Sequence, residues 1–180
     1  MYREVGDSLR IAAALRSLTE VACAKGEYPR ARALGEESLA IERALGNRQG
    51  IAYSLNDLGL VAIESSNYAA AWALNDESLS ISQELADRWS IALSLELPAY
   101  LATGRGRPDS AARMWGAMER LREEIGAPPP SERTRYDRGV AAVRATIGDA
   151  AFSLAFENGR PMPLEAAIEY ARASSMVERR

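Results

Sequence analysis

Histidine is absent from this chain of 180 residues, and cysteine occurs once, at Cys23. Without histidine, the chain lacks the side chain that most often serves as a general base and as a metal ligand. One thiol cannot supply a thiolate metal cluster or a disulfide framework. Cys23 lies between two alanines and has no accompanying base, so we expect it to be a small packing residue and not a nucleophile. We therefore predict no catalytic residue, no metal site and no cofactor, which means that the protein is not expected to be an enzyme.

An excess of charge of one sign is also lacking. The net charge is only −3, and acidic and basic residues are mixed along the chain. Because phosphate binding needs a basic stripe, no direct nucleic-acid partner is expected. Apolar runs are short and interrupted by charge, so we expect no membrane span, and the start of the chain lacks the apolar stretch of a secretory signal. With the single cysteine, these features predict a cytoplasmic protein.

What the chain does contain is an internal repeat. Three stretches align without gaps at a spacing of forty residues, and 16 of 40 positions are identical between the first two. A fixed period of this length is typical of a solenoid, in which each unit buries its apolar face only against its neighbours. Solenoid surfaces bind other molecules, so the repeat indicates a binding protein. The clearest columns are Ile11, Ile51 and Ile91; Leu15, Leu55 and Leu95; Ala31, Ala71 and Ala111; and Leu45, Leu85 and Ile125.

Each unit is predicted to be a helical hairpin. In the second unit, apolar residues recur at three- and four-residue steps before and after the polar segment 64–68. The other two units break at the same place, at 25–29 and 104–108, where glycine favours a turn and proline the start of a helix. The predicted fold class is therefore all-α. The hairpins are expected at 11–46, 51–86 and 91–126.

The second unit carries a further pattern in Leu58, Gly59, Ala71 and Ser78. This spacing resembles the tetratricopeptide repeat, which places Leu-Gly on the first helix and two small residues on the second. Small residues are needed there because the two helices cross closely. The forty-residue period resembles the long variety of this repeat, and the resemblance covers roughly residues 5–127. It implies a right-handed α-solenoid that binds a protein or peptide.

The start of the chain does not begin a whole hairpin in this register. Val5 aligns with Leu45 and Leu85, so the chain is expected to open with the last turn of a second helix whose own first helix is missing. A bare terminal repeat exposes its stacking face. Two explanations stay open: the chain is a piece of a longer protein, or another molecule covers that face. In the second case a homodimer would bury Met1, Val5 and Leu9.

The end of the chain departs from the repeat. Prolines 128–130 stop the third unit, because proline cannot continue a helix. Residues 131–180 then carry helical patterns outside the forty-residue register. The sequence therefore predicts a repeat domain over 1–127 and a helical C-terminal cap over 131–180.

This region also resembles the end of the repeat arm in large bacterial signal-transduction ATPases and transcriptional regulators. The resemblance rests on residues 111–117, 125–128, Tyr136 and 163–167. It implies the sensor or scaffold arm of such a regulator, although no Gly-Lys-Ser/Thr phosphate-binding motif occurs in this chain. The alternatives are a free-standing adaptor that self-associates through its first hairpin, and a small-molecule sensor.

The tetratricopeptide resemblance also implies a binding groove, because first helices line the concave side of that solenoid. Asn56 can hydrogen-bond a peptide backbone as donor and acceptor, and Arg16 can hold a carboxylate. The alternative is a solvated helix face with internal pairs, such as Arg16 with Glu20. The predicted groove residues are Arg16, Glu20, Tyr53, Asn56, Leu60, Glu64, Glu96 and Tyr100.

Overall fold

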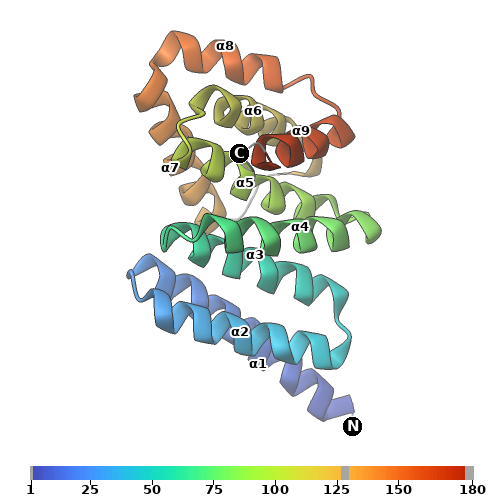
Figure 1. The fold of residues 1–180 in the computed structure, drawn as a ribbon. Coiled ribbons are helices and arrows are strands. Elements are labelled where there is room, and N and C mark those ends of the chain that lie inside the picture. The colour runs from blue at the N-terminus through green and yellow to red at the C-terminus, as the bar shows by residue number, and fades with distance from the viewer. Residues whose placement is uncertain (1, 127–129, 177–180) are drawn as a thin grey trace. The chain divides into compact units, whose positions relative to one another are not determined.

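The computed structural model describes residues 2–126 and 130–176, with side chains described over 6–126 and 136–174. All secondary structure in the described residues is helical, so the predicted all-α class is confirmed (Figure 1). Among these residues, no helix is both long and apolar enough to cross a bilayer. The helices are α1 (Tyr2–Ala24), α2 (Tyr28–Leu45), α3 (Arg48–Glu64), α4 (Tyr68–Glu84), α5 (Arg88–Gly104), α6 (Pro108–Ile125), α7 (Pro130–Ile147), α8 (Asp149–Gly159) and α9 (Leu164–Met176).

The chain divides into two compact units, Met1–Ser90 and Ile91–Arg180. The first unit contains α1 to α4, and the second contains most of α5 together with α6 to α9. The division by packing therefore falls before the third hairpin, whereas the sequence places the boundary after it. The physical reason is that α6 packs against α7, α8 and α9, so the third hairpin shares a core with the C-terminal helices.

The forty-residue period recurs in the backbone of the turns. A positive φ lets a chain leave a helix sharply, and glycine adopts it without strain. Six equivalent turn positions of the repeats have a positive φ, and four of them are glycines. The other two are Ser66, with φ 60°, and Ala86, with φ 51°. The six residues are Gly26, Ser66 and Gly106 inside the hairpins, and Gly46, Ala86 and Gly126 after them.

Small residues are buried where the paired helices cross. Ala31, Ala71 and Ala111 are each 0% exposed. The hydroxyl of Ser38 donates to the carbonyl of Ala12 at 3.0 Å, and one repeat later Ser78 donates to Ala52 at 2.8 Å. The two hairpins of the first unit therefore have equivalent hydrogen bonds where their helices cross, and their helices pack in equivalent positions.

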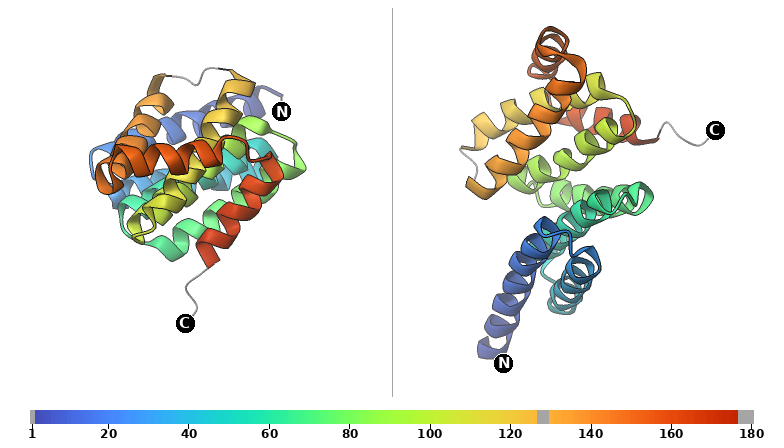
Figure 2. Two further views of the ribbon diagram at one scale, coloured as in Figure 1. Left: turned by 90° about the horizontal axis from the view of Figure 1, so that it is seen from above. Right: turned by 90° about the vertical axis from the view of Figure 1, so that its left-hand side faces the viewer.

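The core of the first unit is centred on α3. Its apolar residues Leu55 and Leu58 cluster with Leu39 of α2 and Ile81 of α4. Figures 1 and 2 show α1 and α2 running side by side in this unit. Because α2 and α4 both pack against α3, that helix is buried along nearly its whole length.

The first helix differs from the prediction. It runs without a break from Tyr2 to Ala24, through the point at Gly6 where the end of an earlier helix was expected. Its counterpart Gly46 has φ 65° and ends α2, whereas Gly6 has no positive φ. Glycine permits a left-handed turn but does not require one.

Candidate functional site

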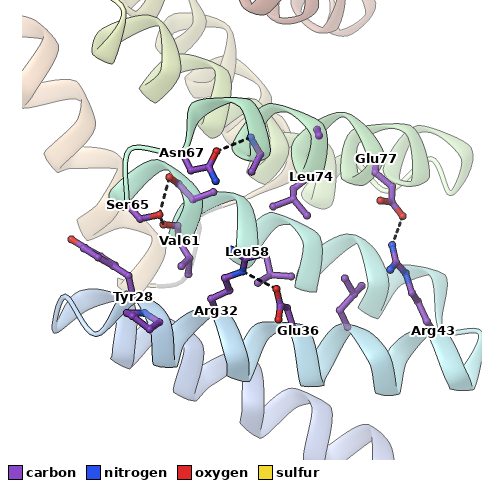
Figure 3. Close-up of a pocket in the computed structure, with 15 residues that line it drawn as sticks. Tyr28, Arg32, Glu36, Arg43, Leu58, Val61, Ser65, Asn67, Leu74 and Glu77 are labelled. Carbon is purple, nitrogen blue, oxygen red and sulfur yellow. Dashed lines mark hydrogen bonds and ion pairs between the residues drawn. The ribbon is translucent and has the colours of Figure 1, made fainter.

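A groove lies between α2 and α4 in the first unit, and α3 forms its floor. Its volume is about 690 Å³. In Figure 3, Tyr28 lies at one end of the groove, while Arg43 and Glu77 meet at the other. The groove lies over α3 because α2 and α4 both pack against that helix.

The floor of the groove is apolar. Leu39, Leu58 and Val61 are only 7%, 5% and 3% exposed, and the half-buried Leu74 continues the surface onto α4. Gly35 on α2 sets the depth of this floor, because a β-carbon at residue 35 would lie 2.7 Å from Cδ2 of Leu58. An apolar side chain entering the groove would therefore meet a packed floor that needs no rearrangement.

The rim of the groove carries two ion pairs. Arg32 Nε and Glu36 Oε1 are 2.8 Å apart on α2, and Arg43 Nη2 and Glu77 Oε1, also 2.8 Å apart, join α2 to α4. These side chains are about half exposed or more, so solvent screens both pairs. Two positive and two negative charges cancel, and the rim does not select an acidic or a basic ligand by net charge.

At one end of the groove, the polar side chains form hydrogen bonds to nearby backbone groups. Ser65 donates its hydroxyl to the carbonyl of Val61 at 2.8 Å, and Asn67 Oδ1 accepts from the backbone N–H of Ala70 at 3.2 Å. The first bond closes the end of α3, and the second caps the start of α4. These side chains therefore position the helices at this end.

The structure brings together part of the groove predicted from the sequence. Arg16 on α1 lies with its Cζ 4.6 Å from the ring centroid of Tyr53 on α3. Its Nε donates to Oδ2 of Asp57 at 3.0 Å, and Asp57 is only 7% exposed. Arg16 was expected to hold the carboxylate of a ligand, but in the structure it holds a carboxylate of the protein. Asp57 was missing from the predicted set.

The other first-unit members of that set differ in accessibility. Asn56 is 3% exposed, and its Nδ2 has no hydrogen-bond partner among the described residues. Leu60 is half-buried, while Glu20 and Glu64 are exposed. The predicted groove residues on α1 and α3 form what we call the α1–α3 face, and ligand binding by this face stays a prediction.

In the second unit, Glu96 lies in the core, and the half-buried Tyr100 contacts the core through Trp115. Glu96 is 0% exposed and forms a hydrogen-bonded ion pair with Arg122, which is 5% exposed. The prediction that Glu96 lines an open groove is therefore corrected, because its carboxylate is needed beside a buried guanidinium. The ring of Tyr100 meets Trp115 edge-on, with centroids 5.3 Å apart.

Tyr136 completes this buried cluster. Its ring lies 5.1 Å from Trp115 between centroids and 5.0 Å from the Cζ of Arg122. Burial raises the pKa of Tyr136 well above its usual range, so the phenol stays protonated. The cluster ties α5, α6 and α7 together.

Two of the three residues proposed for self-association lie outside the described side chains, namely Met1 and Val5, and Leu9 is half-buried on α1. Among the described residues, no three acidic or cysteine side chains are placed to hold a metal ion. The groove between α2 and α4 was missed because only first helices were considered. The sequence contains an apolar column on the second helices, with Leu34 and Leu74, but only the structure shows that Leu74 lines the groove.

Comparison with known proteins bears on the two hairpins that form the groove. Residues 10–84 match the family model of the tetratricopeptide repeat. The match and the helical hairpins together support a tetratricopeptide repeat protein, and the matched residues end at Glu84, inside the first unit. No curated protein and no solved structure matches the chain. Tetratricopeptide repeats commonly serve as protein-interaction modules, so the match supports that functional class for residues 10–84.

Proposed function

We propose that the chain binds a peptide segment of a partner protein in the groove between α2 and α4. The observation that carries this proposal is the preformed groove of about 690 Å³ with an apolar floor. Ligand sites are commonly concave, largely apolar and formed before binding, with a few polar groups that orient the ligand. An amphipathic segment suits such a groove, because its apolar side chains reach the floor while its polar side faces the rim.

The α1–α3 face is a weaker candidate within the first unit. Its cation, Arg16, already has a carboxylate partner in Asp57 and an aromatic partner in Tyr53. A ligand carboxylate would have to displace Asp57, which is only 7% exposed and would lose its buried cation. The groove between α2 and α4 needs no such exchange.

Matched alanine-to-arginine variants test the assignment. Peptides selected from a random twelve-residue display library against the wild-type chain serve as the probe. Ala73 and Ala69 are both exposed on α4, but only Ala73 lines the groove. Ala73→Arg should weaken binding of the selected peptides at least about tenfold by filling the groove, whereas Ala69→Arg should leave it nearly unchanged.

A double variant, Arg16→Ala with Tyr53→Ala, tests the competing face with the same peptides. Loss of binding in this folded double variant, with normal binding by Ala73→Arg, would overturn the groove assignment in favour of the α1–α3 face. Circular dichroism checks that each variant retains its helices.

We also infer the biological setting, in which the chain is the sensor or scaffold arm of a bacterial cytoplasmic ATPase or transcriptional regulator. Support comes from the resemblance of residues 111–117 and 163–167 to the end of such arms. The genomic reading frame upstream of the Met1 codon tests this setting. A frame that continues through further repeats into a phosphate-binding loop is expected, and an intervening stop codon would favour a free-standing adaptor.

A further inference from the structure

An apolar stripe is exposed along α1. Ile11, Leu18 and Val21 are 52%, 47% and 51% exposed, although such side chains are normally buried. Their spacing of seven and three residues places them on one face of the helix, and Ala14, also exposed, lies between them. The stripe therefore forms a continuous seam at the spacing used by paired helices.

The repeat shows that this face is built for packing. The residues forty positions later, Ile51, Leu58 and Val61, are only 8%, 5% and 3% exposed. Leu58 approaches Gly35 of α2, and Val61 clusters with Ala31 of the same helix. In α3, these three residues are therefore covered by α2, whereas the equivalent residues of α1 are exposed in the described part of the chain.

We propose that the seam of α1 pairs with α1 of a second copy of this chain in an antiparallel arrangement. One residue in the seam distinguishes this partner from a further hairpin of the same repeat. In α3 the column contains Ser54, whose hydroxyl meets Ser38 of α2 at 3.1 Å. Ala14 occupies that column in α1, so this seam is wholly apolar and offers nothing to such a serine.

Charge complementarity at the ends of the seam sets the direction. Asp7 and Lys25, both exposed, extend the same spacing at its two ends, and Asp7 also forms an exposed ion pair with Arg10 of its own helix. In an antiparallel pair related by a two-fold axis, each Asp7 faces Lys25 of the other copy, whereas a parallel pair would bring like charges together. The apolar contacts between the copies then match in pairs: Ile11 with Val21, and Ala14 with Leu18.

The pairing does not compete with the proposed peptide site. None of the seam residues lines the groove between α2 and α4, so each copy in the dimer retains its groove. A dimer would therefore present two peptide sites, and the test of the dimer is independent of the test of the peptide site. The dimer does require the free-standing form of the chain, because the upstream repeats of a regulator arm would cover the same face of α1. A bivalent partner would gain avidity from this arrangement.

Sedimentation equilibrium tests the dimer. The wild-type chain, of 19.6 kDa, should show a concentration-dependent mass that reaches twice this value. Leu18→Glu should raise the dissociation constant at least about tenfold, because it places a carboxylate in the seam of both copies. The matched control is Leu154→Glu on α8, where the leucine is 68% exposed and outside the seam, and it should dimerise like the wild type.

Disulfide trapping tests the direction in a Cys23→Ser background. Oxidation of a mixture of the Ile11→Cys and Val21→Cys variants should link the two chains, while neither variant alone should crosslink. In an antiparallel pair, the two copies of residue 11 are separated by about 15 Å along the axis, too far for a disulfide.

Four results would overturn the proposal. The first is a wild-type chain that stays monomeric up to about 1 mM, a range in which even weak pairing is populated. The second is a dimer that Leu18→Glu leaves intact. The third is crosslinking of each cysteine variant with itself, which indicates a parallel pair. The fourth is an assembly that grows beyond a dimer, which indicates open-ended stacking.

Discussion

Gly116 on α6 and Gly159 at the end of α8 each lie against the backbone of the other helix. A β-carbon at residue 116 would clash with the carbonyl oxygen of Phe156, and one at residue 159 would clash with that of Arg113. The second clash extends to the carbonyl carbon of Arg113 at 2.8 Å. Because backbone atoms cannot move aside as a flexible side chain can, these glycines allow α6 and α8 to cross at this distance. In Figure 1 the two helices lie next to each other in the second unit.

Gly116→Ala and Gly159→Ala should each lower the free energy of unfolding by at least about 2 kcal/mol, because the added methyl group forces the helices apart. Urea denaturation followed by circular dichroism measures the loss. Gly6→Ala is the matched control, since nothing lies within 4 Å of a β-carbon there, and it should stabilise the helix by about 0.5–1 kcal/mol. Equal effects at the three glycines would show that α6 and α8 are not in close contact.

Ala86→Gly and Ser66→Gly should raise the free energy of unfolding by about 0.5–1 kcal/mol each. Both residues have a positive φ, at positions where the other repeats have glycine. Relief of the left-handed strain outweighs the extra freedom that glycine gives to the unfolded chain. Ala40→Gly, at an exposed helical position of α2, should instead cost about 0.5–1 kcal/mol. Destabilisation by Ala86→Gly would show that this turn is not left-handed in solution.

Arg122→Met should lower the free energy of unfolding by about 3–5 kcal/mol, because it removes the cation beside the fully buried carboxylate of Glu96. A double-mutant cycle with Glu96→Gln should show a coupling energy above about 1 kcal/mol between the two side chains. The exposed pair Arg120–Glu124, at 2.8 Å, provides the control, and Arg120→Met should cost less than about 1 kcal/mol. Similar costs for the two arginine variants would contradict the buried pair.

Asp87→Asn should destabilise the protein at neutral pH and much less in acid. Burial alone would raise the pKa of Asp87, but hydrogen bonds from Gln49, Ser90 and Trp89 outweigh burial and lower it. A folded-state pKa below the unfolded value of about 3.9 means that the stabilisation is present above that pH and is lost as the pH falls below it.

Urea denaturation across the pH range measures the effect of Asp87→Asn. The difference from the wild type should be below about 1 kcal/mol at pH 6, because asparagine can still cap the helix and only the charge and one acceptor oxygen are lost. The difference should shrink below about pH 4. Glu37→Gln, at an exposed carboxylate on α2, should change little at either pH. A difference that is the same at both values would show that the ionised carboxylate is not the stabilising form.

Much of the fold could be predicted from the sequence because its signals are local. The apolar steps along 51–62 identify a helix without reference to the rest of the chain, and the breaks at 25–29, 64–68 and 104–108 are where the structure turns. The error at Gly6 has the same origin. The repeat register is a pattern of residue types, and a glycine in the register of Gly46 turns only if a neighbouring helix makes the turn favourable.

Less of the candidate site could be predicted, because availability for binding depends on pairing across helices. Arg16 has the appearance of a free cation in the sequence, yet it meets Asp57, which lies 41 residues away. Glu96 has the appearance of a groove carboxylate, yet Arg122 of another helix holds it in the core. Neither partner lies within a helical turn of the residue it pairs with.

Apolar periodicity and turn chemistry act over a few residues, so the helical hairpins and their forty-residue period can be read from the sequence alone. Where a ligand can enter depends on the tertiary structure. The groove over Leu58 depends on how far α2 and α4 stand apart across α3, and that spacing is a property of three packed helices. The tertiary structure also shows that Leu18 is exposed, although Leu58, its counterpart in the next repeat, is buried.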